Sequence, residues 1–273
     1  MRRLPITNIP LRRCPVLELL YPFQTFRAWW YAASLRTQAR FQRTLLGSSW
    51  LGISNLLSVL VLAFVYGVLL KVPDPKQYFL YIAVGLTIWQ FISMIISTSP
   101  TLLRDHKEKL MNTPTHPIFY FLEEWAFQIQ TFLQAWAIVI VVLAIFVQPN
   151  LLWNGVLFAA LPIINLFLFC IVVQIFFALA GLLFQDLYQV IPMLLQLTFL
   201  SSPVLFSKVN LGEHQWIANW NPLFLILAPV RQAAIDGHLA LGQQLAILVA
   251  NLLACALLVL GLGRWRQWIV FNL

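Results

Sequence analysis

Residues 153–184 read WNGVLFAALPIINLFLFCIVVQIFFALAGLLF, a run without a single charged residue or histidine. A helix of about 20 apolar residues crosses the hydrocarbon core of a bilayer, so this run predicts a transmembrane helix. The rest of the chain has the same character, because 61% of its 273 residues are hydrophobic and 10% are charged. Soluble domains are about half apolar and about a quarter charged. The composition therefore excludes an ordinary soluble enzyme, a disordered protein and a nucleic-acid-binding module.

Six runs are apolar enough to serve as transmembrane helices. They cover residues 50–70, 78–99, 125–147, 153–184, 190–206 and 241–262. The sequence shows neither an internal repeat nor a low-complexity segment. We therefore expect an all-α integral membrane protein with a single transmembrane domain over residues 1–273.

The stretch before the last run has a different character. Residues 216–230 are apolar, but the stretch is short and contains Pro222 and Pro229. Such a segment favours a re-entrant or broken helical element shielded by other helices, and we expect residues 207–235 to form an outer gate. If residues 216–230 crossed the membrane instead, there would be seven spans and the C-terminus would lie on the other side.

The positive charges favour six spans with both termini in the cytoplasm. In that topology the cytoplasmic segments hold 13 of the 17 Lys and Arg residues, and the outer segments hold 4. Membrane proteins concentrate Lys and Arg in their cytoplasmic segments. We therefore expect a multi-pass protein with cytoplasmic N- and C-termini.

Residues 23–45 precede the first span and carry two kinds of side chain. At helical spacing one face is apolar and an adjacent face is basic, with Phe26, Trp30, Ala33, Phe41 and Leu45 on the first and Arg36, Arg40 and Arg43 on the second. This pattern predicts an amphipathic helix lying in the cytoplasmic interface. A basic flank that merely fixes the orientation of the first span fits the same residues.

The chemistry that the spans lack also limits the function. Their apolar centres contain no Asp, Glu, Lys, Arg or His, whereas ion-coupled carriers generally place ionisable groups within the membrane. Backbone carbonyls can bind sodium instead, so a secondary carrier is disfavoured rather than excluded. None of the 11 glycines is followed by lysine, so the chain has no phosphate-binding loop of the Gly-Lys-Ser/Thr type. If transport is driven by ATP, the ATPase is another polypeptide.

A membrane enzyme is the other class to weigh. The polar groups available are His106, His116, Glu123 and Glu124 on one side, and Glu213, His214, Asp236 and His238 on the other. They do not repeat a metal-ligand spacing, and the three cysteines lie far apart in the sequence. We therefore expect no catalytic residue, no metal site and no cofactor in this chain.

Three motifs occur in a fixed order along the chain. They are FQRTLLGSSW at residues 41–50, QDLYQVIPMLLQ at 185–196 with FLSSPV at 199–204, and WNPL at 220–223. With the hydropathy pattern over most of the chain, these motifs resemble the membrane-spanning subunits of ABC type-2 polysaccharide exporters, which export O-antigen, capsule or teichoic-acid chains. Gln185 stands where the family usually has a basic residue, and the loop over residues 103–117 resembles the capsule branch more than the O-antigen branch.

The resemblance implies a homodimer in the bacterial inner (plasma) membrane, joined to two copies of a cytoplasmic ABC ATPase that holds ATP and Mg²⁺. It also implies a coupling helix over residues 100–118 that docks into the ATPase. Its apolar knobs would be Leu102, Leu103, Leu110 and Met111, and its polar rim Arg104, Asp105, Lys107, Glu108 and Lys109. An ordinary solvated loop is the alternative for this segment.

The implied substrate is a long glycan on a polyprenyl pyrophosphate. Arg36, Arg40 or Arg43 would face its phosphates, although attraction to anionic membrane lipids would use the same residues. Charge-poor spans with many aromatic residues suit a sugar polymer. The candidates for channel or gate are Trp50, Tyr66, Trp89, Phe199, Pro203, Trp216, Trp220, Asn221 and Pro222. Anchoring at the membrane interface is the alternative role for the Trp and Tyr residues among them. A type-2 permease for a drug or free lipid would have the same topology.

Overall fold

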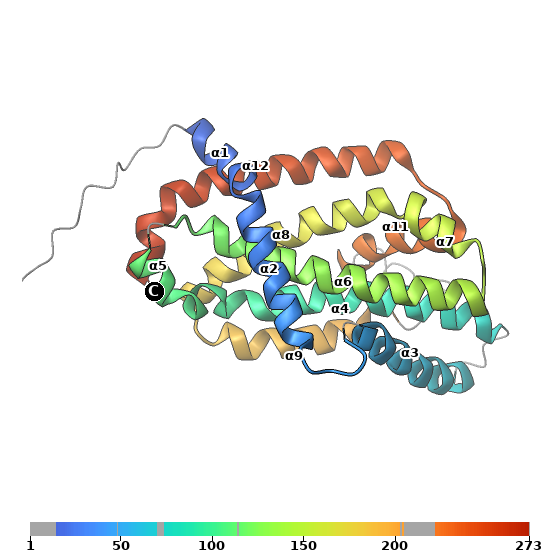
Figure 1. Ribbon diagram of the computed structural model, residues 1–273. Coiled ribbons are helices and arrows are strands. Elements are labelled where there is room, and N and C mark those ends of the chain that lie inside the picture. Colours follow the sequence, from blue (N-terminus) through green and yellow to red (C-terminus); the bar gives the residue numbers. More distant parts are fainter. Residues whose placement is uncertain are drawn as a thin grey trace, which may run out of the picture.

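The structure is a computed structural model that describes residues 15–47, 49–69, 74–113, 115–202, 204 and 222–272. Within these ranges every regular element is helical (Figure 1). The elements are α1 (Pro15–Gln24), α2 (Phe26–Phe41), α3 (Ser49–Leu69), α4 (Pro75–Asp105), α5 (Lys107–Asn112), α6 (Ile118–Phe146), α7 (Leu151–Trp153), the π-helical turn η1 (Asn154–Phe158), α8 (Ala160–Leu183), α9 (Leu187–Ser201), α11 (Pro222–Asp236) and α12 (Leu241–Asn272).

Five of these helices are long and apolar enough to cross a membrane, namely α3, α4, α6, α8 and the part of α12 up to Trp265. The predicted all-α integral membrane fold is confirmed. The run predicted over residues 190–206 corresponds to α9, which is apolar but has only 15 residues and ends at Ser201. At 1.5 Å per residue α9 extends about 22 Å, short of the roughly 30 Å hydrocarbon core. The sixth span therefore stays a prediction.

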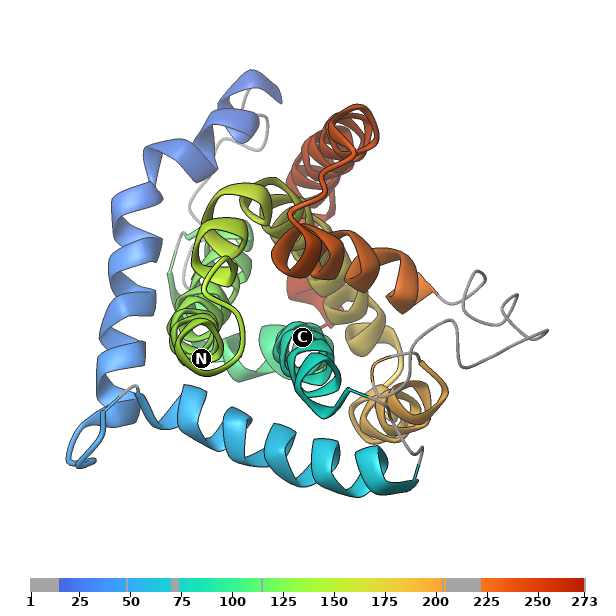
Figure 2. The ribbon, with the colours of Figure 1, turned by 90° about the vertical axis from the view of Figure 1, so that its right-hand side faces the viewer.

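The long helices α4, α6 and α8 run side by side, and α4 lies at the centre of the bundle (Figures 1 and 2). In an 18-residue apolar stretch of each helix, 67% of the stretch is buried in α4, against 17% in α3 and 6% in α12. Asp74 starts α4 by accepting hydrogen bonds from the backbone N–H groups of Lys76 and Gln77, and Pro75 occupies the first helical position, where a missing N–H costs nothing. The helix α4 is therefore the core of the fold, and α3 and α12 are peripheral.

Two predicted boundaries differ from the structure. The helix α4 does not end near residue 99 but continues through Pro100 to Asp105, so the first six residues of the predicted coupling helix are the end of this span. The run 153–184 is not one helix, because η1 interrupts it before α8 begins at Ala160. Both differences reflect backbone geometry that hydropathy does not record.

The helix α2 lies across the long helices and packs on α6 (Figure 1). The predicted segment 23–45 is divided, since α1 ends at Gln24 and α2 ends at Phe41. The predicted apolar face was partly wrong: the residues of α2 that are buried are Trp29, Ala33 and Thr37, whereas Phe26 and Leu45 are exposed. The buried face is set by the contact with α6, because Thr37 and Ser34 both hydrogen-bond to Gln130 of that helix.

The peripheral helix α3 is held by a close approach and one buried hydrogen bond. A Cβ atom on Gly52 would lie 2.5 Å from the Cβ of Ile138 in α6, so only glycine allows this approach without a shift. Three residues further along, Asn55 Nδ2 donates to Thr87 Oγ1 of α4 at 2.7 Å. These two contacts fix α3 between α4 and α6.

We expect Gly52→Ala to destabilise the protein by about 1–3 kcal/mol, because the added methyl overpacks the α3–α6 contact. The measurement is thermal unfolding of the purified protein in detergent. The matched control in the same helix is Gly67→Ala, where the nearest side-chain atom is 3.8 Å from the new Cβ. Equal melting temperatures for the two variants would contradict the close approach.

Candidate functional site

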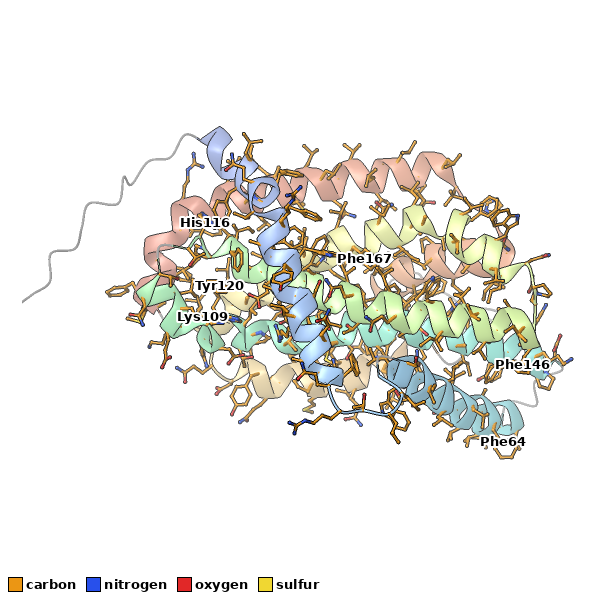
Figure 3. All side chains as sticks on the ribbon, in the orientation of Figure 1. Phe64, Lys109, His116, Tyr120, Phe146 and Phe167 are labelled. Atoms are coloured by element: carbon orange, nitrogen blue, oxygen red, sulfur yellow. The ribbon has the colours of Figure 1, made fainter. Side chains whose placement is uncertain are left out.

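The segment predicted to dock onto a partner lies at the end of the bundle that carries α5, where Lys109, His116 and Tyr120 also lie (Figure 3). The charged side chains Asp105, Lys107, Glu108 and Lys109 are exposed there, and Met111 is 59% exposed. The exposed side chains of the predicted docking segment therefore include these charged groups and one methionine.

Three of the predicted apolar knobs are not on this surface. Leu102, Leu103 and Leu110 are at most 6% exposed and pack with Ile118 and Phe121 in the core of the subunit. Leu110 of α5 lies in the same buried cluster as the end of α4 and the start of α6. In this structure these three leucines are therefore not exposed to a partner, and their docking role stays a prediction.

The last predicted member of this segment, Arg104, is also turned toward the protein. Its Nη2 donates to the backbone oxygen of Gly181 in α8 at 2.6 Å. Two of the histidines considered for an enzyme are packed as well, since the ring of His106 lies against Tyr120 and that of His116 against Tyr21. In the ranges that the structure describes, no three His, Cys, Asp or Glu residues are grouped so as to hold a metal ion.

The three arginines predicted to face phosphate have different surroundings. Arg36 Nη1 donates to the carboxylate of Glu124 in α6 at 2.5 Å, and its guanidinium lies 4.4 Å from the centroid of the Phe127 ring. Glu124 is almost fully buried, and it also accepts a hydrogen bond from Gln128 at 2.7 Å. The charge of Arg36 is thus used within the protein to neutralise a buried carboxylate.

Arg40 and Arg43 remain exposed. Arg43 lies in the loop after α2 and has a positive φ of 68°. Arg40, one turn after Arg36 in α2, lines a cavity of about 110 Å³ between α2, α3, α4 and α6. The structure therefore separates the predicted cluster into one paired arginine, one loop arginine and one arginine at a cavity.

The cavity beside Arg40 is lined by uncharged polar groups and aromatic rings. The polar residues are Ser54, Thr87, Gln90, Gln128 and Thr131, and the apolar ones are Leu51, Phe91, Met94, Phe132 and Ala135. Amides, hydroxyls and aromatic faces next to one cation match a ligand that carries both an anionic group and hydroxyls. The sequence prediction missed these residues, since uncharged polar side chains within apolar runs leave the hydropathy pattern unchanged.

A second cavity of about 190 Å³ lies between α8, α11 and α12. Asn165 Nδ2 donates to the backbone and side-chain oxygens of Gln244 at 3.0 and 2.9 Å, and Asn251 Nδ2 donates to the backbone oxygen of Asn165 at 3.1 Å. The other lining residues, such as Leu166, are apolar. This polar contact joins α12 to the bundle.

The predicted outer gate is described only in part. Pro203, Trp216, Trp220 and Asn221 lie outside the described residues, and Pro222 begins α11. Within α11, Arg231 is buried, and its guanidinium lies 3.7 Å from the centroid of the Tyr81 ring in α4.

The guanidinium of Arg231 also sits over Gly85, where a Cβ would come within 2.0 Å of Nη2. A glycine one turn after Tyr81 therefore makes room for the cation in a low-dielectric environment, where cation–π attraction is strongest. Arg231 was counted among the outer charges in the sequence analysis, but its burial on α4 was not foreseen.

The other predicted channel aromatics are distributed between the core and the periphery. Trp89 is buried, and its ring lies against that of Phe199 in α9, with centroids 5.6 Å apart. Tyr66 packs partly buried against the same core, whereas Trp50 is 53% exposed. Phe64 and Phe146 are exposed at the opposite end of the molecule from α5 (Figure 3). Lining of a channel by Trp89 would require a movement of α9 away from α4.

Comparison with known proteins gives the family. No curated protein matches the chain. The profile of the family described as ABC-2 type transporter matches residues 25–235, well over half of the chain. This family comprises permease subunits of transporters and implies an ABC ATPase as partner. The chain therefore belongs to the ABC-2 type transporter family, as a multi-pass, membrane-spanning subunit of an ABC exporter.

Proposed function

We propose that this subunit exports a lipid-linked polysaccharide, of the O-antigen, capsule or teichoic-acid kind, across the bacterial inner membrane. It acts as a homodimer joined to two copies of the ABC ATPase, with its N- and C-termini in the cytoplasm. ATP and Mg²⁺ bind to the ATPase. The subunit itself supplies the path and changes shape when the ATPase closes.

The observation that carries the proposal is the cavity beside Arg40. A polyprenyl-linked glycan has a pyrophosphate, which a guanidinium binds through charge-assisted hydrogen bonds. It also has sugar hydroxyls, which pair with amides and hydroxyls such as those of Gln90, Gln128 and Thr131. Gln128 already donates to Glu124, and Thr131 donates to the backbone oxygen of Gln128, but amide and hydroxyl groups can each form further hydrogen bonds. A purely apolar drug would use none of this capacity.

The ion pair of Arg36 with the buried Glu124 supports the same assignment. With the buried carboxylate neutralised by Arg36, the positive charge of Arg40 is available for a ligand. The crosswise position of α2 agrees with a helix at the headgroup level, where the pyrophosphate of the lipid carrier lies. The two arginines thus have different roles although they are one helical turn apart.

We expect Arg40→Gln to raise, by about tenfold, the concentration of polyprenyl pyrophosphate that half-maximally stimulates ATP hydrolysis, since one charge-assisted hydrogen bond is lost. The measurement uses the subunit with its ATPase in nanodiscs. Arg43→Gln is the matched control, because Arg43 is exposed in the loop and does not line the cavity.

Polyprenol without phosphate serves as the second probe in that experiment. It should stimulate hydrolysis little in any variant. Stimulation by polyprenol equal to that by the pyrophosphate would contradict polysaccharide export and would favour a permease for a drug or free lipid.

We expect Met111→Asp to weaken binding of the ATPase at least about tenfold, because a buried apolar contact is replaced by a charge beside exposed Glu108. Co-purification and ATP hydrolysis by the complex are the measurements. Met111→Leu keeps an apolar side chain and should leave both unchanged. Normal assembly of the Met111→Asp variant would show that α5 is a solvated turn rather than a docking element.

A further inference from the structure

Two helices touch backbone to backbone at the end of the bundle that carries α5. A Cβ on Gly181 of α8 would lie 2.4 Å from the backbone oxygen of Pro100 in α4 and 2.7 Å from its Cα. These are main-chain atoms that no rotamer change can move aside. Position 181 therefore accepts only glycine if α4 and α8 keep this distance.

Arg104, one turn further along α4, adds a hydrogen bond to the same contact between α4 and α8. Gly181 lies in the last turn of α8, where backbone oxygens lack a partner within the helix. The hydrogen bond from Arg104 Nη2 to the Gly181 oxygen satisfies one of them at 2.6 Å. A cation at a helix C-terminus is also favoured by the helix dipole. Pro100, Arg104 and Gly181 together form what we term the α4–α8 joint.

The α4–α8 joint lies between the exposed helix α5 and the more distant helix α9. On one side, α5 follows α4 after the single residue His106, and the ring of His106 hydrogen-bonds back to the Leu102 oxygen at 3.0 Å. On the other side, only residues 184–186 separate the end of α8 from the start of α9. The backbone N–H of Leu187 bonds to the Phe184 oxygen at 3.3 Å, which keeps this connection tight. Neither connection is long enough to absorb a displacement.

We propose that the α4–α8 joint passes the displacement of α5 and the end of α4 to α8, and from there to α9. Arg104 and Gly181 are thus positioning residues for transport and not docking residues. The proposal rests on the proposed function, because it takes the displacement of α5 to come from the ATPase. The physical basis is that closely packed elements have low compressibility, so that a displacement of one is transmitted to the other.

The test uses environment-sensitive bimane labels in the complex with the ATPase in nanodiscs. Cys14, Cys170 and Cys255 are replaced by serine, and a label is placed either at Asn112→Cys at the end of α5 or at Tyr188→Cys in α9, both exposed positions. The fluorescence change on trapping with ATP and vanadate is measured at each. Without further substitution, both labels should respond.

With Gly181→Ala added, the response at Asn112→Cys should persist, because docking is intact. The response at Tyr188→Cys should fall by about fivefold, the lower end of typical coupling between two sites. ATP hydrolysis should continue while transport falls, a separation that a merely structural defect does not give. Gly261→Ala is the matched control, because its new Cβ meets only ordinary contacts at 3.6 Å or more.

A full response at Tyr188→Cys in the Gly181→Ala variant would overturn the proposal. Should that variant fail to assemble, Arg104→Leu and Arg104→Lys decide, because neither adds volume at the helix contact. Lysine keeps a charged donor and should retain most of the response at Tyr188→Cys, whereas leucine should lose it. Equal responses in these two variants would also overturn the proposal. If Asn112→Cys gave no response in the chain without the glycine or arginine substitutions, the proposed docking itself would be wrong, and the joint would lose its basis.

Discussion

The structure depends on the requirement that polar groups at bilayer depth find partners within the protein, since the hydrocarbon core offers no water. The described helices meet this requirement through contacts between helices. Asn55 of α3 bonds to Thr87 of α4, Trp125 Nε1 of α6 donates to the Phe167 oxygen of α8, and Asn165 of α8 bonds to Gln244 of α12. Apolar packing alone would not select these neighbours, because lipid tails compete for apolar surfaces. Each polar pair therefore fixes which helices lie side by side.

The sequence predicted the fold class well, because the hydropathy of a transmembrane helix is a local property. Long apolar runs identified the cores of α3, α4, α6, α8 and α12 without knowledge of their neighbours. It could not predict which face of α2 is buried, since Trp29 and Trp30 are both apolar and only the position of α6 distinguishes them. Nor could it place η1 or the continuation of α4 through Pro100, because backbone geometry rather than composition sets both.

The candidate site was predicted by residue type but not by role. Arg36 and Arg40 are equivalent in sequence, and it is Glu124, 88 residues away, that pairs with one and leaves the other beside a cavity. Leu102, Leu103 and Leu110 had the spacing of an apolar docking face, and the same spacing serves the inner packing of α5. No sequence pattern predicted the contact of Gly181 with Pro100, because a glycine within an apolar run does not indicate which residue of another helix lies against it.

The attachment of α2 has a consequence for the way such a subunit works. Arg36 is tied to a buried carboxylate of α6, and α3 begins a short loop after Phe41, so α2 moves together with the bundle. If α2 rests at the headgroups as proposed, movement of the bundle along the membrane normal would pull this helix into the hydrocarbon core. The proposed transport cycle would then rely on tilting and rotation of the helices within the membrane plane.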